Sequence, residues 1–277
     1  MNTTLIPDII VPLNDEIPDI IVPLNDEIHQ LAKQFAKEQT TPEKREQVLL
    51  NTYSVYAVHT YLNWVEINSQ LDLSYSWHPF HQKISNVADL MLPGLGKIEC
   101  LHIKPEQSNI KEIKVSSDAL SNRFGYVIVQ FTETINQVKL LGFVLPKYVD
   151  IKAQKLNLDD VKPLDDLLLH IFHLEESIKI LEKELEGKED NKNFDIVKET
   201  ILDKQLPQII TEFYDFYDDG NYKTDDDYIE KAANIFLPQK EVELLKGDED
   251  EVLEMIGEIQ DFAEELLEKF AEIWQEN

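Results

Sequence analysis

The chain has only one cysteine, Cys100, among its 277 residues, and this excludes an intrachain disulfide. The scarcity of cysteine favours a reducing compartment. Long hydrophobic runs are missing as well, because no stretch approaches the roughly 18 apolar residues that a membrane helix needs. The first residues carry Asp8, Asp15 and Glu16 instead of the basic segment of a secretory signal. We therefore expect a cytoplasmic protein that makes no membrane contact.

Motifs for nucleotide or nucleophilic chemistry are also missing. The LPGLGK run at 92–97 lacks the glycine spacing and the following Ser or Thr of a phosphate loop, so it predicts a tight turn into a strand. Cys100 follows among the apolar residues Ile98 and Leu101, which favours a small buried hydrophobic role instead of a nucleophile. We assign no catalytic residue and no cofactor, and we expect a protein that is not an enzyme.

Histidine pairs provide the few candidates for a metal site. His78 and His81 form one pair, and His170 and His173 form another, with Glu176 three residues further along the same predicted helix. Zinc sites need three or four ligands, and no further ligand can be identified here. The acidic stretch 214–228 lacks the bidentate glutamate of a calcium loop. We assign no metal, and His170, His173 and Glu176 remain the alternative ligand set, with the two histidines expected to flank the apolar face of their helix.

Negative charge is what the chain has in excess, and it is concentrated in the second half. The 54 acidic and 26 basic residues give a net charge of -28; residues 1–150 hold 18 acids and 12 bases, and residues 151–277 hold 36 and 14, a balance of -22. A field of this sign repels nucleic acid and anionic lipid, and it attracts basic protein surfaces. We therefore exclude direct nucleic-acid binding and expect a basic protein partner or self-association.

The beginning of the chain contains a duplication. IPDIIVPLNDE occupies 6–16 and recurs without a change at 17–27. Each copy brackets a short apolar run with prolines, at 9–11 and at 20–22, which suits an edge strand or an extended arm. The second copy leads directly into a helical pattern, so we expect it to be the structural copy and 1–19 to be an N-terminal arm. A docking arm and a tolerated duplication are both open readings.

The following segment predicts an α+β domain over 20–160. Helices are expected over 24–39 and 41–66; Thr41 can cap the second, and Pro42 fits its first turn. Four strands are expected at 97–103, 110–115, 124–131 and 138–146. Helices followed by closely connected strands indicate N-terminal helices packed on a small antiparallel or mixed sheet.

The remainder, 161–277, predicts an acidic helical bundle. One apolar seam recurs at alternating three- and four-residue spacing over 164–185, and a second does so over 252–273 within a helix expected at 248–276. Between them we expect a charged linker at 187–193, a helix over 194–217 that Pro207 kinks or divides, and a shorter helix over 225–236. The width of the second seam favours burial in a bundle of four helices.

Several pieces of sequence carry a resemblance to a known family. They are VYAV at 55–58, SWHP at 76–79, ADLMLPGLGKIEC at 88–100, RFGYVIVQF at 123–131, LLGFVLP at 140–146 and LDDLLLHI at 164–171. Over about residues 20–175 the chain resembles the cyanobacterial domain-of-unknown-function family 1822. The resemblance implies the α+β scaffold, a cyanobacterial origin and a regulatory role, and it brings no established activity. Beyond residue 175, where family members continue with β-rich sequence, this chain has acidic helices.

These observations predict a non-enzymatic interaction or regulatory protein whose acidic helical half binds a basic protein partner. The partner would be steered by charge and would then cover an apolar stripe. One alternative is an enzyme or metal-binding protein with a site in the α+β domain, near Trp77, His78, His81 and Cys100. Another is a DNA-mimic inhibitor of a nucleic-acid-binding protein. For the preferred function, the residues expected to contact the partner are Ile256, Ile259, Leu266, Phe270 and Trp274.

Overall fold

The computed structural model describes residues 20–107, 110–188, 191–204, 206–218, 232–237 and 249–275. Its first half is built on a five-stranded sheet in the order β1-β6-β5-β3-β2. β3 and β5 are parallel and the other neighbours are antiparallel, so the sheet is mixed, as expected. The strands are β1 (Ile20–Pro23), β2 (Asp89–Leu92), β3 (Gly96–Ile103), β5 (Gly125–Phe131) and β6 (Gln137–Val144).

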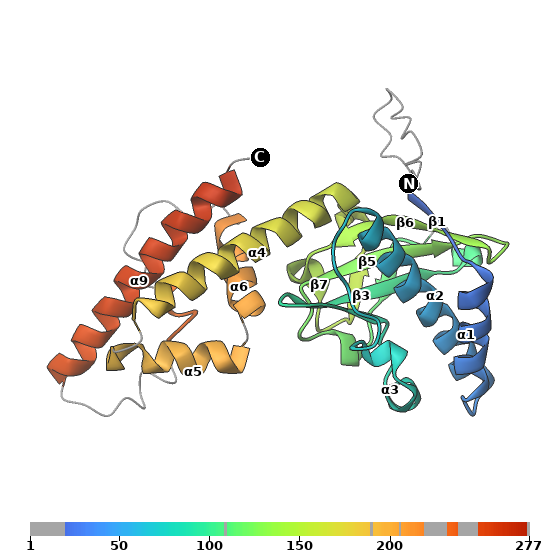
Figure 1. Cartoon of the computed structure of the whole chain (residues 1–277), viewed down its shortest axis with the longest axis horizontal. Helices are drawn as coiled ribbons and strands as arrows, with labels where there is room; N and C mark the ends of the chain where they lie inside the picture. Colours follow the sequence, from blue (N-terminus) through green and yellow to red (C-terminus); the bar gives the residue numbers. More distant parts are fainter. Residues whose placement is uncertain are drawn as a thin grey trace, which may run out of the picture.

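A second, smaller antiparallel sheet has the order β4-β8-β7. Its strands are β4 (Glu112–Lys114), β7 (Val149–Asp150) and β8 (Lys155–Asn157). The helices of the described residues are α1 (Asp26–Lys37), α2 (Pro42–Trp64), α3 (Pro79–Ile84), α4 (Leu164–Glu186), α5 (Asp195–Lys204), α6 (Leu206–Asp218) and α9 (Glu249–Gln275). The chain is therefore of the α+β class (Figure 1).

The large sheet is covered on both faces. Along β5, Val127 and Val129 pack into the apolar cluster that holds α1 and α2, whereas Tyr126 and Ile128 pack into a second cluster with the small sheet. Successive side chains of a strand point to opposite faces, and here each face is buried. This explains why the strand is apolar from Tyr126 to Val129 instead of alternating with polar residues.

The N-terminal elements follow the sequence signals closely. The second repeat copy supplies β1, which pairs with β6 at the edge of the sheet. Its Asn25 caps α1 by accepting a hydrogen bond from the Ile28 amide at 2.9 Å. Thr41 likewise accepts from the Lys44 amide at 3.2 Å and caps α2, with Pro42 in the first turn. The expected edge strand and the cap at Thr41 are confirmed, the cap at Asn25 was not predicted, and the first copy lies outside the described residues.

Gly142 is the point at which the sheet meets the chain that leads into α4. β6 carries a bulge, because Ile128 pairs with Gly142 while Val129 pairs with Leu140. Phe143 and Lys162 then exchange two backbone hydrogen bonds, of 2.9 and 2.8 Å, just before α4 begins. Gly142 has a φ of +149°, and a Cβ placed there would lie 2.2 Å from the Lys162 carbonyl oxygen. Only glycine allows this close approach.

The second half is helical. Figure 1 shows α4 running from the sheet into this half, with α9 beside it. The two predicted seams face each other, since α4 contacts α9 and both contribute to one apolar cluster. Pro207 does divide the predicted helix, because α5 ends at Lys204 and α6 starts at Leu206. Within the described residues, no helix combines the length and the apolarity needed to cross a bilayer.

Some expectations were incomplete. The strands β2, β7 and β8 were not predicted. The strand expected at 110–115 is present as β4, but it belongs to the small sheet and not to the large one. The helix expected over 225–236 and the acidic stretch 214–228 lie largely outside the described residues. The domain division at 160/161 stays a prediction; Phe143 of the sheet and Leu167 of α4 belong to one continuous apolar cluster across it.

Candidate functional site

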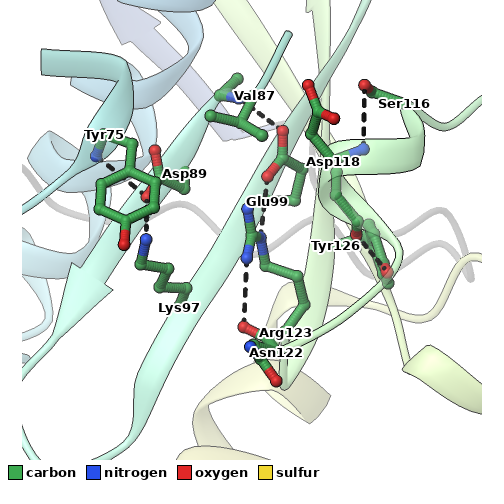
Figure 2. Close-up of polar contacts among 12 residues, drawn as sticks. Tyr75, Val87, Asp89, Lys97, Glu99, Ser116, Asp118, Asn122, Arg123 and Tyr126 are labelled. Atoms are coloured by element: carbon green, nitrogen blue, oxygen red, sulfur yellow. Dashed lines mark hydrogen bonds and ion pairs between the residues drawn. The ribbon is translucent and has the colours of Figure 1, made fainter. Parts of the chain in front are cut away.

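Two buried ion pairs stand side by side at one end of the large sheet (Figure 2). Asp89 of β2 lies directly across from Glu99 of β3, and neither carboxylate reaches solvent, with exposed fractions of 0% and 1%. The Lys97 Nζ lies 3.0 Å from an Asp89 oxygen, and the Arg123 Nε lies 2.9 Å from a Glu99 oxygen. Two acids in cross-strand contact are tolerated here because each has its own cation.

Asp89 is held as a carboxylate. The backbone amides of Tyr75 and Ser76 donate to its two oxygens, at 3.0 and 2.7 Å, in addition to the Lys97 ammonium. Burial alone raises the pKa of Asp89, but Lys97 and these amides outweigh it, so the pKa lies below its ordinary value. The Ser76 hydroxyl donates to the Asp89 carbonyl oxygen at 2.6 Å, which fixes the turn at Tyr75–Trp77 to β2.

Glu99 is in a different environment. It accepts from the Ala88 amide and from Arg123, and burial raises its pKa more than these two donors lower it. The pKa values of two facing carboxyls are thus moved in opposite directions, a pattern typical of acid–base sites. Both carboxyls are nevertheless fully covered by the protein, so a substrate has no access to them. The pairs can therefore position neighbouring groups, and their geometry does not fit a general acid or base.

A crevice of about 780 Å³ opens beside this network, between the α+β half and the helical half. Lys97 and Arg123 line it from the sheet, Ile178 and Glu182 from α4, and Pro207 from α6. Its size is within the range of about 300–1,000 Å³ that is usual for ligand sites, which often lie between domains. Both halves, buried cations and exposed acids meet in this crevice, and a neighbouring cavity of about 340 Å³ shares Lys97, Arg123 and Pro207 with it.

An aromatic stack forms one wall of the crevice. The His81 ring lies parallel to the Tyr75 ring at 4.2 Å between centroids. The Lys97 ammonium lies 3.0 Å from the centroid of Tyr75, and the same ammonium pairs with Asp89. The stack therefore joins the half-exposed Tyr75 to the buried ion pair, as the left part of Figure 2 shows for Tyr75, Lys97 and Asp89.

The residues named for the enzyme alternative are not brought together as a nucleophilic site. Cys100 is fully buried, although it borders a second cavity of about 370 Å³, and burial raises the pKa of its thiol well above the ordinary value. A protonated thiol is a poor nucleophile. The ring of His78 accepts a hydrogen bond from the Phe80 amide at 3.3 Å, and Trp77 packs edge-on to Phe35. His81 lines the crevice.

The alternative metal ligands lie on α4 but point into different environments. His170 and His173 are each 3% exposed, so the expectation that they flank the seam is wrong. The His170 ring stacks on Phe143 at 6.0 Å and meets Tyr214 edge-on at 5.4 Å. Glu176 pairs with Lys179 at 2.6 Å. In the part of the chain that the structure describes, no three His, Cys, Asp or Glu side chains gather closely enough to hold a metal ion.

The burial of His170 makes the stability of the folded protein depend on pH. Neither of its ring nitrogens makes a hydrogen bond within the described residues; the Phe124 backbone lies close but does not complete one. Burial, together with the smaller effect of the nearby His173, lowers the pKa of His170 to about 3. A group with a lowered folded-state pKa binds fewer protons when folded, so stability falls as the pH drops below the ordinary value of 6.5.

We therefore expect His170→Phe to reduce the acid sensitivity of folding. Between pH 6.5 and about 4.5, His170 should cost the wild type on the order of 2 kcal/mol, and the variant should escape this loss. Urea unfolding at several pH values measures the slope. Phe172→Leu, which changes an exposed ring on the same helix, should keep the wild-type slope. An unchanged slope in His170→Phe would contradict the assignment.

The residues predicted to contact a partner pack against other parts of this chain. Ile259, Leu266 and Phe270 are fully buried, Trp274 is 7% exposed, and Ile256 is half-buried. Phe270 packs against Phe213 of α6, and Trp274 packs against Tyr214. Contact with an outside partner through these residues would require α9 to leave the bundle, and it stays a prediction.

The sequence analysis did not predict the ionic network, although its residues lie in segments that it had singled out. Asp89, Lys97 and Glu99 lie in the ADLMLPGLGKIEC piece, and Arg123 opens RFGYVIVQF. All four therefore belong to segments that carry the family resemblance. The usable signal was a charged residue inside a strand that is otherwise apolar, since a buried charge requires a partner.

Comparison with known proteins returned one result. The family model described as "Protein of unknown function (DUF1822)" matches residues 22–229, which is most of the chain. The searches of curated proteins and of solved structures each returned no match. The matched range begins within β1 and extends past α6, so the expectation that the resemblance ends near residue 175 is wrong. The range contains the ionic network and both walls of the crevice.

Proposed function

The chain belongs to the DUF1822 family, and from that premise we propose that it is a non-enzymatic interaction protein of the cytoplasm whose acidic helical half binds a basic protein partner. A regulatory role follows if the partner's activity depends on being bound. The proposal is supported chiefly by one observation: the outward face of α9 is a continuous acidic stripe.

The stripe is defined by side chains at alternating four- and three-residue spacing. These are Glu254, Glu258, Asp261, Glu265, Glu268 and Glu272, which lie on the side of α9 opposite its buried seam. Glu258 is held by Asn191 and Asn193, and Glu265 pairs with Lys269. The other four are exposed. Since the seam is covered by this chain itself, the stripe is what α9 offers to a partner.

Electrostatic steering supplies the mechanism. The half that carries the stripe has a balance of -22, so a basic protein is attracted over distances of about a Debye length, ~8 Å at physiological salt. Such complexes form fast and weaken as salt rises. A DNA-mimic inhibitor is a special case of this function, in which the basic partner would release DNA when the chain binds.

Neutralising the stripe should abolish capture of the partner. We expect a variant with Glu254→Gln, Asp261→Asn, Glu268→Gln and Glu272→Gln to bind about tenfold more weakly than the wild type, with a shallower dependence on salt. Affinity capture from a lysate of the native host, repeated across a salt series and read by mass spectrometry, measures this. A basic protein retained by the wild type at low salt and lost from the variant is the expected result.

A matched control removes four negative charges from the α+β half. The control substitutions are Glu38→Gln, Asp72→Asn, Glu106→Gln and Glu133→Gln. They change exposed residues that form no ion pair among the described residues, and the same partner should stay bound. If the wild type retains no basic protein at low salt, or if both variants lose it equally, the proposed function is wrong.

A further inference from the structure

The crevice beside the ionic network indicates how the partner is held. Four of its lining groups are charged: Lys97, Arg123, Asp118 and Glu182. The two cations are already neutralised by Asp89 and Glu99. Asp118 and Glu182 are exposed, and neither forms an ion pair among the described residues, although Asp118 interacts with the nearby Lys44 ammonium and Glu182 has no such neighbour. The charge that the crevice presents to a ligand is therefore negative, although its wall contains two cations.

Arg123 leaves one donor group unused. Its side chain is only 5% exposed; Nε donates to Glu99, and Nη1 donates to the carbonyls of Ser121 and Asn122. Among the described residues, Nη2 has no hydrogen-bond partner, and the residue lines the crevice. Nη2 is not among the buried atoms of the described residues that lack a partner, so water reaches it from the crevice, and an oxygen of a ligand can replace that water. Because Glu99 already balances the charge, a neutral carbonyl oxygen satisfies this donor as well as an anion does.

The rest of the wall is apolar. Met91 from β2, Ile178 from α4, and Leu206 and Pro207 from α6 are each half-buried and border the same space. Such a surface suits the alkyl stem of a lysine or arginine, whose charged end can reach a carboxylate at the rim. A ligand that matches the crevice therefore offers a backbone carbonyl to Arg123, an aliphatic stem to the apolar wall and a cation to the acidic rim. A basic peptide has all three groups.

We propose that this crevice binds an extended, lysine- or arginine-containing segment of the basic partner. Arg123 Nη2 donates to a main-chain carbonyl of the segment, and Asp118 and Glu182 accept hydrogen bonds from its basic side chain. The inference rests on the proposed function and adds the place where a segment is held: the acidic half attracts the partner, and the crevice retains it. Asp118 already accepts from the Asn86 amide at 3.1 Å, which keeps its carboxylate at the rim.

The test uses the full chain and a defined probe. A heptapeptide in which three lysines alternate with glycines is titrated into the protein by calorimetry at low salt, and the same peptide with glutamine in place of lysine is its control. We expect binding of the lysine peptide only. Asp118→Asn with Glu182→Gln should weaken it about tenfold, and Arg123→Lys, which keeps the charge facing Glu99 but lacks Nη2, should weaken it several-fold.

A matched pair separates the crevice from general attraction. Glu175→Gln with Glu186→Gln removes the same charge from exposed helical positions outside the crevice and outside the stripe, and affinity should change less than about twofold. Equal weakening by both pairs, or no binding of the lysine peptide by a wild type that still captures its partner from lysate, overturns the crevice proposal and leaves the proposed function standing. Loss of the lysate capture itself overturns the proposed function.

Discussion

Gly142→Ala should prevent stable folding. The new Cβ would lie 2.2 Å from the Lys162 carbonyl oxygen and 2.6 Å from a Val161 methyl carbon. Neither neighbour can yield easily, because Lys162 is tied to Phe143 by two backbone hydrogen bonds immediately before α4. The φ of +149° adds backbone strain for any residue with a side chain. We expect a loss of at least about 3 kcal/mol, or insoluble protein.

The matched control is the same substitution in α9. Gly257 lies in the helix, and a Cβ there would meet nothing within 4 Å. Gly257→Ala should therefore raise the free energy of unfolding by about 0.5–1 kcal/mol, because alanine is the better helix former. Thermal and urea unfolding of both variants measure the contrast. A Gly142→Ala protein as stable as the wild type would show that the contact between β6 and the chain entering α4 is not close.

The fold was most predictable where one segment carries its own signal. The helix α2 has a capping threonine, a first-turn proline and a long apolar stretch, and the seven-residue strand β5 is apolar except for Gln130. By contrast, β7 and β8 have two and three residues, and their apolar side chains gain meaning only through the second cluster, where Leu156 meets Val149. Short strands defined by distant partners leave little periodicity in the sequence.

The site was less predictable for two reasons. Asp89 and Glu99 belong to a chain with 54 acids, so nothing in their residue type distinguishes them from solvated ones until the register places them opposite each other. The seam of α9 was recognised correctly, but a three- and four-residue spacing specifies a helical partner without saying which chain provides it. Here the partner is α4 of the same chain, so the proposed contact surface moves to the opposite face of α9.

Arg123→Met should destabilise the protein by about 3–5 kcal/mol at neutral pH, since the 1% exposed carboxylate of Glu99 would keep only the Ala88 amide. The loss should shrink in acid. Without its guanidinium, Glu99 has its folded-state pKa raised further above the ordinary value of 4.5, so the folded state binds the extra proton. Stability of the variant therefore falls as the pH rises from 4.5 towards that raised pKa and stays low above it.

Two companion variants make the Arg123 result specific. Adding Glu99→Gln to Arg123→Met removes the stranded charge, so most of the stability should return and its pH dependence should disappear, because an uncharged buried pair avoids the desolvation penalty. Lys155→Met breaks the exposed pair with Glu112 and should change the urea midpoint little. Two results would contradict this explanation. Either Lys155→Met and Arg123→Met lower the free energy of unfolding equally, or Arg123→Met is equally unstable at pH 5 and pH 8. In either case the buried carboxylate is not what requires Arg123. The expected pattern instead gives Arg123 two tasks: Nε and Nη1 hold the strand end together, and Nη2 remains available to the crevice.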